Sequence, residues 1–151
     1  MMRIGVISDT HGRLRAEAAE RLAGVDFILH AGDLDDLEIL DALERIAPVY
    51  AVRGNNDWGG WAQELPQVMR FSLGGVSFCM AHRRESIPWG LDRVDVVICG
   101  HTHRYSEEWI MKRLWLNPGS CSYPRPYLTV PTMAMLTVEE DGTFSVEKIE
   151  L

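Results

Sequence analysis

The sequence lacks any apolar run that approaches the roughly 20 residues of a membrane-spanning helix. A strand-like segment begins almost at the first residue and leaves no room for a signal peptide. Cysteine is scarce: Cys79, Cys99 and Cys121 are an odd number and stand far apart, two of them in apolar strand-like segments. We therefore expect no membrane association, buried free thiols in place of disulfides, and a location in the reducing cytoplasm.

Basic residues are in the minority, with 15 Lys and Arg against 22 Asp and Glu and a formal net charge of -7. A nucleic-acid-binding protein usually presents a basic face or a stripe of basic and aromatic residues, and this sequence has no such stripe. Nucleic acid is therefore not an expected partner. A small phosphorylated substrate remains compatible with the acidic balance, because bound cations would reverse the local field of the site.

The rest of the composition is that of a globular protein, with 46% apolar and 25% charged residues. A length of 151 residues suits one domain with one or two hydrophobic layers. We predict a single domain over residues 1–151, without repeats or linkers.

The order of expected elements predicts an α/β fold. Short apolar strands are expected at 3–8, 26–30 and 49–52, and helices at 14–23 and 34–46. This β-α-β-α-β order implies parallel strands joined by right-handed crossovers. The second half predicts a hairpin of strands 67–73 and 76–81, an apolar run at 95–99, and further, antiparallel strands at 106–111, 113–116, 132–138 and 143–149. We expect two sheets.

Side chains that bind metals follow the apolar strands of the first two-thirds of the chain. They are Asp9, His11, Asp33, Asn55, His82, His101 and His103. Because sites in open α/β sheets form beyond the carboxyl ends of the strands, we expect all seven to converge at one edge. Carboxylate, imidazole and amide donors together suit Mn, Fe, Zn or Co, and are too rich in nitrogen for calcium.

Each short motif also has an ordinary structural explanation. Asp and Gly favour turns, so the Asp-x-His-Gly segment at 9–12 alone is weak evidence, and a lone His82 is more often a hydrogen-bonded histidine than a ligand. The His101-Thr102-His103 motif is stronger, because two histidines on one face are unfavourable to bury without partners. The ordered set, at successive strand ends, predicts a metal site. His30 stands outside the set and is expected to be a packed, hydrogen-bonded core residue.

Five tryptophans are many for this length. Trp58 and Trp61 follow Asn55 in a glycine-rich loop, and they would either line a substrate cleft or bury against a second subunit. Trp109 and Trp115 are expected to pack in the core.

With this set of motifs, the sequence resembles the calcineurin-like metallophosphoesterases, and within them the small single-domain phosphodiesterases of bacteria and archaea. The matching segments are Ser8-Asp9-Thr10-His11-Gly12, His30-Ala31-Gly32-Asp33, Arg53-Gly54-Asn55-Asn56-Asp57, Ala81-His82, Gly100-His101-Thr102-His103 and Asn117-Pro118-Gly119-Ser120. The resemblance implies a four-layer αββα sandwich with two mixed β-sheets.

The resemblance also implies a cofactor, two divalent cations, with manganese as first choice and nickel, zinc, iron or cobalt as alternatives. It assigns Asp9, His11, Asp33 and His103 to one cation and Asp33, Asn55, His82 and His101 to the other, so that Asp33 bridges. These seven residues are the expected metal ligands and catalytic set. The cations would share a water whose pKa they lower, and the hydroxide would attack phosphorus in line.

Two departures from the family pattern concern substrate contacts. Many members have a histidine, a proposed acid for the leaving group, where this chain has Asn56, which has no titratable proton. The usual His-Gly-His after the hairpin is His82-Arg83-Arg84 here. Asn56, Arg83 and Arg84 are the expected substrate-binding residues, and the arginines would either grip phosphate or form a solvated surface pair.

The expected activity is that of a phosphodiesterase acting on a small phosphorylated substrate. One alternative is a scaffold or binding module, because a subunit of the retromer coat has this fold and an Ile-Pro-Trp-Gly segment like the one at Ile87-Pro88-Trp89-Gly90. The other alternative is a nuclease, which the acidic balance disfavours. A homodimer or homotetramer is compatible with the sequence.

Overall fold

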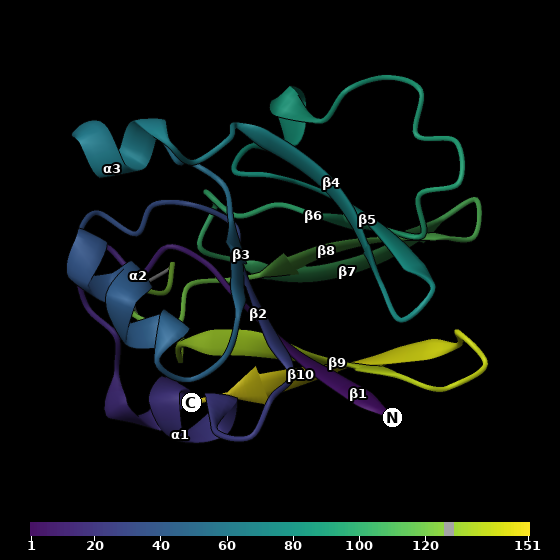
Figure 1. Cartoon of the computed structure of the whole chain (residues 1–151), viewed down its shortest axis with the longest axis horizontal. Helices are drawn as coiled ribbons and strands as arrows, with labels where there is room; N and C mark the ends of the chain where they lie inside the picture. The colour runs from purple at the N-terminus through teal and green to yellow at the C-terminus, as the bar shows by residue number, and fades with distance from the viewer. Residues whose placement is uncertain (126–128) are drawn as a thin grey trace.

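The computed structural model describes residues 1–125 and 129–151, and within them ten strands form two five-stranded sheets (Figure 1). The first sheet has the order β10-β9-β1-β2-β3 and the second β4-β5-β6-β8-β7. The strands of the first sheet are β1 (Met2–Ile7), β2 (Phe27–His30), β3 (Val49–Ala51), β9 (Thr132–Val138) and β10 (Phe144–Glu150). Those of the second are β4 (Val68–Leu73), β5 (Val76–Ala81), β6 (Val96–Ile98), β7 (Tyr105–Ile110) and β8 (Arg113–Pro118).

Both sheets are mixed. In the first, β1, β2 and β3 are parallel, as the β-α-β-α-β order predicts, and β9 runs antiparallel to β1 and β10. In the second, β5, β6 and β8 are parallel, while β4 and β7 are antiparallel edge strands. The predicted α/β class with two mixed sheets is confirmed.

Helices are short and few in the described part of the chain. They are α1 (Ala16–Leu22), α2 (Leu37–Glu44), α3 (Gly60–Gln63) and the 3₁₀ turn η1 (Arg84–Ser86). Figure 1 shows the sheets stacked, with α1 and α2 against the outer side of the first sheet. None of these helices is long and apolar enough to cross a membrane.

Three apolar clusters fill the spaces between the layers. The largest lies between the sheets and contains Ile4, Leu29, Phe78 and Leu136. A second lies between the first sheet and its helices, around Leu22 and Leu43. The third, on the outer face of the second sheet, packs Val97 and Cys99 against Ile87, Leu91 and Trp115, so the outer layer there is η1 and the segment that follows it.

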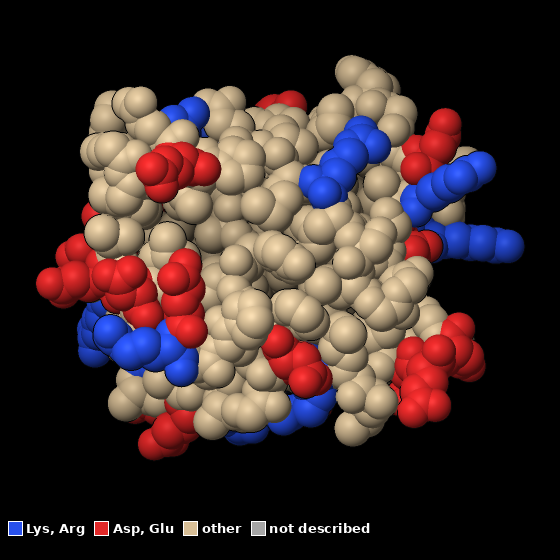
Figure 2. Space-filling model, in the orientation of Figure 1, with Lys and Arg blue, Asp and Glu red and all other residues tan. Residues whose placement is uncertain are grey.

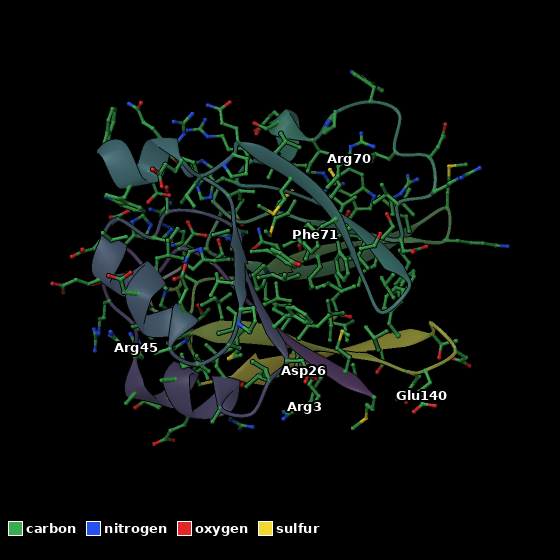
Figure 3. The ribbon with its side chains drawn as sticks, in the orientation of Figure 1. Arg3, Asp26, Arg45, Arg70, Phe71 and Glu140 are labelled. Atoms are coloured by element: carbon green, nitrogen blue, oxygen red, sulfur yellow. The ribbon has the colours of Figure 1, made fainter. Side chains whose placement is uncertain are left out.

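An aromatic row crosses the space between the edge strands of the two sheets. Phe27, Tyr50, Phe71 and Phe78 follow one another with ring centroids 5.9, 4.6 and 5.1 Å apart. Phe71 on β4 lies between the sheets in Figure 3. Such offset contacts stabilise the packing of β3 against β4 and β5.

The charge lies mostly outside these layers. Figure 2 shows acidic side chains grouped over α2, which contains Glu38, Asp41 and Glu44. The visible face has no continuous basic patch.

Two expectations about single residues have clear outcomes. The three cysteines are free and buried, as predicted. The prediction that Trp109 packs in the core is wrong: it lies on the edge strand β7, is 57% exposed, and stacks on Phe144. Trp109 pairs with Leu114 and therefore points toward the same side as the core between the sheets, but β7 is the last strand of its sheet, so the indole lies at the rim of that core and stays exposed to solvent.

Candidate metal centre

The chain folds so that the carboxyl ends of strands from both sheets meet. Asp9 and His11 follow β1, and Asp33 follows β2, in the first sheet; His82 follows β5, and His101 and His103 follow β6, in the second. The loops are bonded to one another in pairs, with Asp9 N donating to Gly32 O at 3.0 Å and Gly100 N to His82 O at 2.9 Å. The convergence expected from the strand ends is therefore present for these six side chains.

The first group of donors is Asp9, His11 and His103, whose ligand atoms lie within 4.8 Å of one another. Nε2 of His11 lies 3.1 Å from Nε2 of His103. Oδ1 of Asp9 lies 3.3 Å from His103 Nε2 and 3.7 Å from His11 Nε2. These three atoms surround one point.

The second group is Asp33, His82 and His101, also within 4.8 Å. Nε2 of His82 lies 3.2 Å from Oδ2 of Asp33 and 3.3 Å from Nδ1 of His101. The two groups adjoin, because Asp33 Oδ2 lies 3.6 Å from His11 Nε2 and Asp9 Oδ1 lies 3.9 Å from His82 Nε2. Asp33 therefore faces both groups.

Three imidazoles are held by their outer nitrogen. Nδ1 of His11 donates to Oδ2 of Asp35 at 3.0 Å, and Nδ1 of His82 donates to Ala31 O at 2.7 Å. Nδ1 of His103 donates to Tyr123 O. A proton fixed on Nδ1 leaves the lone pair of Nε2 directed at the centre, which is how metal-binding histidines are usually oriented.

Asp57 holds the backbone of the two loops that contain Asp33 and Asn55. Its buried carboxylate accepts hydrogen bonds from the amides of Asp33 at 3.0 Å, Asp35 at 2.8 Å and Gly54 at 2.8 Å. Its carboxylate already has three donors, so among Asp33, Asp35 and Asp57, which also lie close together, it is the least free to bind a cation.

The backbone at the centre is unusual. Five of the six grouped residues have a positive φ: Asp9 (56°), His11 (44°), Asp33 (62°), His101 (74°) and His103 (62°). A non-glycine residue in the left-handed region costs about 1–2 kcal/mol, and such residues concentrate at functional sites. Connecting the strands does not by itself require this strained backbone, so the strain points to a functional role of these loops.

The electrostatics of the centre favour positive charge. Burial by itself would raise the pKa of Asp9, but the facing His103, His11, His82 and Ser8 lower it below its usual value. The facing carboxylate of Asp9 is the main cause that raises the pKa of His11 to about 9, although burial opposes it. Burial opposes ionisation of His82 too, yet Asp33 and Asp9 raise its pKa. Two carboxylates with little access to water attract cations here.

Oδ1 of Asp9 tests whether these residues fit a metal. It is the one buried side-chain oxygen or nitrogen in the described part of the chain that has no hydrogen-bond partner. The atoms nearest to it are Nε2 of His103, His11 and His82, at 3.3, 3.7 and 3.9 Å, and the outer nitrogen Nδ1 of each of these rings is already engaged elsewhere. Acceptors that converge without a donor need a cation between them, and the carboxylate and imidazole set suits a transition metal. The residues fit.

The remaining predicted residues lie beside the groups. Asn55 is exposed and lines a hollow together with His82, with its Nδ2 3.5 Å from Asn56 Oδ1. The backbone amide of Asn56 donates to Oδ1 of Asp33 at 2.9 Å.

The two arginines after His82 point to different places. Arg83 lines the same hollow as Asn55, and burial followed by the positive charges of His82 and Arg83 lowers the pKa of His101. Arg84 lies on the outer face of the second sheet, 4.7 Å above the ring of Trp115 and 3.2 Å from Glu108. Arg83 thus shares a hollow with His82 and Asn55, whereas Arg84 shares a separate hollow with His101.

Sequence reasoning missed three residues that contact or border the site. Ser8 Oγ donates to Asp9 Oδ2 at 2.6 Å, Asp35 holds His11, and Arg53 lines the hollow beside Asn55. The available signal was their position: Ser8 and Arg53 lie within two residues of a ligand type, and Asp35 repeats the carboxylate of Asp33 two residues later.

The other interpretations from sequence concern supporting residues. His30 is fully buried, accepts from Gly32 N at 3.0 Å and contacts Thr10 Oγ1 at 3.1 Å, so its prediction as a core residue is confirmed. Trp58 is 78% exposed and borders a hollow that contains Arg53, whereas Trp61 packs partly buried against the helix layer.

Comparisons with known proteins agree with this geometry. Residues 2–141 match the model of the calcineurin-like phosphoesterase superfamily domain. A probable metallophosphoesterase of Methanocaldococcus jannaschii is 36% identical over 92% of this chain and 77% of its own length.

Two solved structures have the same fold. One, described as a novel archaeal phosphodiesterase, has a TM-score of 0.78 and 28% identity, covering 98% of this chain and all of its own. The other, wild-type Vps29 of Entamoeba histolytica complexed with zinc, has a TM-score of 0.75 and 26% identity, covering 99% of both chains.

Proposed function

The chain belongs to the calcineurin-like phosphoesterase superfamily and is a hydrolase of phosphoric esters, and we propose that it acts as a phosphodiesterase on a small phosphorylated substrate. The observation that supports this most directly is the pair of adjoining Asp and His groups around the unpartnered Oδ1 of Asp9.

We propose that two divalent cations occupy these groups. Asp9, His11, Asp33 and His103 would hold the first, and Asp33, Asn55, His82 and His101 the second, with manganese as first choice and nickel, zinc, iron or cobalt as alternatives. When bound, the cations would supply Lewis acidity that activates water and withdraws charge from phosphoryl oxygens.

The chain's own residues would orient this chemistry. Asp35 and the carbonyls of Ala31 and Tyr123 keep three imidazole rings in position. Asp57 fixes the distance between the loops of Asp33 and Gly54. Asn56 donates through its backbone to Asp33 but offers no titratable proton, so the leaving group must depart as a stable anion or take its proton from solvent.

Replacing Asp33 tests the proposal. Asp33→Asn removes the charge that faces both groups, so the variant should bind less than one manganese ion per chain and lose more than about 100-fold in kcat/KM on bis-p-nitrophenyl phosphate. Metal content would be measured by elemental analysis after gel filtration. Asp41→Asn, an exposed carboxylate on α2, is the matched control and should change neither quantity. Full activity with two bound metals in Asp33→Asn would refute the assignment.

A second candidate function is a non-catalytic scaffold, and the similarity to the structure of Vps29 is the reason to consider it. The comparisons favour it less than a phosphoesterase, since the relative in the archaea is described as a phosphodiesterase. Wild-type protein that holds its metals yet cleaves no phosphodiester would support the scaffold. An assay on single-stranded DNA would test the nuclease alternative in the same way.

The domain organisation, the location and the oligomeric state are also proposals. We propose one domain over residues 1–151, a location in the cytoplasm, and either a homodimer or a homotetramer in solution. Light scattering of the purified chain would test the oligomeric state.

A further inference from the structure

A polar hollow of about 180 Å³ adjoins the second donor group. His82 and Asn55 form one side of it, and its other polar side chains are Arg53, Gln67, Arg83 and Ser86. No carboxylate is among the described residues that line it, although the chain as a whole is acidic. The hollow therefore presents two guanidinium groups, an amide and a hydroxyl next to two expected metal ligands.

Neither guanidinium group is engaged by another residue of the described part of the chain. Within the described residues, no ion pair or side-chain hydrogen bond involves the guanidinium of Arg53 or Arg83. Arg84, the next residue along, contrasts with them, because it is paired with Glu108 and stacked on Trp115. Unpaired guanidinium groups match the oxygens of a phosphoryl group, which they can bind bidentately.

The hollow lies beside the second donor group and does not reach the first, so it differs from the place where the reacting phosphorus is expected. It contacts His82 and Asn55, but none of Asp9, His11 and His103 is among its lining residues. A phosphoryl group bound to Arg53 and Arg83 would thus lie at one flank of the centre and leave the space between the two donor groups to another phosphorus.

Asn56 supplies an independent chemical argument. Its backbone amide donates to Oδ1 of Asp33 at 2.9 Å, so the residue adjoins the centre, and its side chain has no titratable proton to give to a leaving group. An alkoxide leaving group needs that proton, because the pKa of an aliphatic hydroxyl is close to the ~15.7 of water. A phosphate monoester does not need it, since its second pKa is about 6 and it departs as a stable anion.

Together, the geometry and this chemistry point to a substrate class. We infer that Arg53 and Arg83 hold the leaving phosphate of a disubstituted pyrophosphate, so that the bond cleaved is a phosphoanhydride between two phosphodiester-like phosphorus atoms. This inference rests on the proposed function and specifies its substrate.

The reaction balances as a hydrolysis. The oxygen of water forms a bond to the phosphorus between the donor groups, and the bond from that phosphorus to the bridging oxygen breaks. The electron pair stays on the bridging oxygen, which leaves as part of the phosphate bound by Arg53 and Arg83. The protons of water pass to solvent or remain on the two phosphate products, according to pH.

Three substrates distinguish the effect of a good leaving group on the rate from the effect of a second phosphate. Diadenosine pyrophosphate has both a second phosphate and a phosphate leaving group, bis-p-nitrophenyl phosphate has only a good leaving group, and adenylyl-adenosine has neither. The adenosine groups also suit the exposed indole of Trp58, which borders a neighbouring hollow that shares Arg53 and Asn55. The manganese-loaded full chain should cleave the first two and cleave adenylyl-adenosine more than about 100-fold more slowly.

The arginine variants give the decisive comparison. Arg53→Gln with Arg83→Gln should lower kcat/KM for diadenosine pyrophosphate about 100-fold, about tenfold for each charge-assisted contact, and the loss on bis-p-nitrophenyl phosphate, which has no second phosphate, should be at least about tenfold smaller. Arg21→Gln with Arg45→Gln removes the same charge from α1 and the end of α2, where Figure 3 labels Arg45, and should change neither.

A binding measurement adds a readout that does not depend on turnover. By calorimetry, the Kd of the non-hydrolysable methylene analogue of diadenosine pyrophosphate should rise at least tenfold in the Arg53 and Arg83 double variant. Equal losses on all substrates, an unchanged Kd, or no cleavage of diadenosine pyrophosphate beside brisk cleavage of bis-p-nitrophenyl phosphate would overturn the inference. Failure to cleave either substrate would instead count against the proposed function itself.

Discussion

Single residues at the centre differ mainly in whether their polar atoms have partners. Ser8 and the amide of His101 both donate to Oδ2 of Asp9, at 2.6 and 3.0 Å, while Oδ1 of the same carboxylate has no donor. Oδ2 is therefore held in place by the protein, and Oδ1 is left free for a ligand.

His30 gives a prediction about pH. Burial is the main cause that lowers its pKa to about 3, so it stays neutral in the folded chain while an unfolded histidine protonates near 6.5. The stability that follows is fully present above pH 6.5 and is lost as the pH falls from 6.5 toward 3. Urea unfolding with a chelator should show wild type losing about 1 kcal/mol more than His30→Gln between pH 7.5 and 5.5. Identical losses would contradict a buried neutral His30.

Asp57 should be important to stability without touching a cation. Asp57→Asn replaces an acceptor of three backbone amides by a group with one oxygen, which should lower the free energy of unfolding by about 3 kcal/mol. Metal affinity should fall with it, because Asp33 moves. Asp36→Asn is the matched control: Asp36 caps α2 by accepting from Glu38 N, and asparagine caps equally well. Thermal melts and metal titration measure both effects; a stable Asp57→Asn with normal affinity would contradict the role given to Asp57.

At the scale of elements, the strands were predictable and the loops between them were not. The expected strands agree with the observed ones within about two residues, because apolar runs bounded by Gly, Asp and Asn are strong signals. Helix α2 begins at Leu37 although the apolar pattern extends back to Leu34. The reason is that Asp33 and Asp35 have φ of 62° and 70°, a bend that helical composition cannot reveal.

Pairing between distant strands was beyond the sequence as well. Strand β9 pairs with β1 although most of the chain lies between them, and β8 pairs with β6 although β7 comes between them in the sequence, and neither pairing follows from local pattern. The ligand types at the strand ends identified most of the centre. Arg53 and Asp35 were missed because their roles depend on which loops meet.

Gly54 gives a prediction at this scale. A Cβ at this position would overlap both the backbone nitrogen and Oδ1 of Asp33, whereas at Gly60 in α3 it would meet nothing within 4 Å. Gly54→Ala should therefore displace Asp33, weaken manganese binding more than about tenfold and lower stability by about 1–3 kcal/mol. Gly60→Ala should be neutral or slightly stabilising. Calorimetric metal titration of both variants decides; unchanged affinity in Gly54→Ala would mean that the loops adjust.

For the whole molecule, the centre connects two sheets that otherwise meet through apolar side chains. Asp9, His11 and Asp33 come from the first sheet, and His82, His101 and His103 from the second. A cation bound by both sets therefore ties the sandwich together at one edge, in addition to the core between the sheets.

Removing metal should consequently lower thermal stability. Metal at 100 times its Kd stabilises the folded chain by about 2.7 kcal/mol, which for this length corresponds to a shift in Tm of about 5–10 °C. Calorimetry in excess manganese and then in a chelator measures the shift, and Asp33→Asn should show little of it. A Tm that does not respond to manganese in wild type would contradict a centre that joins the sheets.

The left-handed backbone at Asp9, His11, Asp33, His101 and His103 has a consequence for protein engineering. Glycine adopts that conformation without steric penalty, so a library sorted only for heat resistance in the presence of a chelator would enrich glycine at these positions and discard catalysts. Directed evolution of this scaffold must therefore screen turnover alongside thermal tolerance in every round.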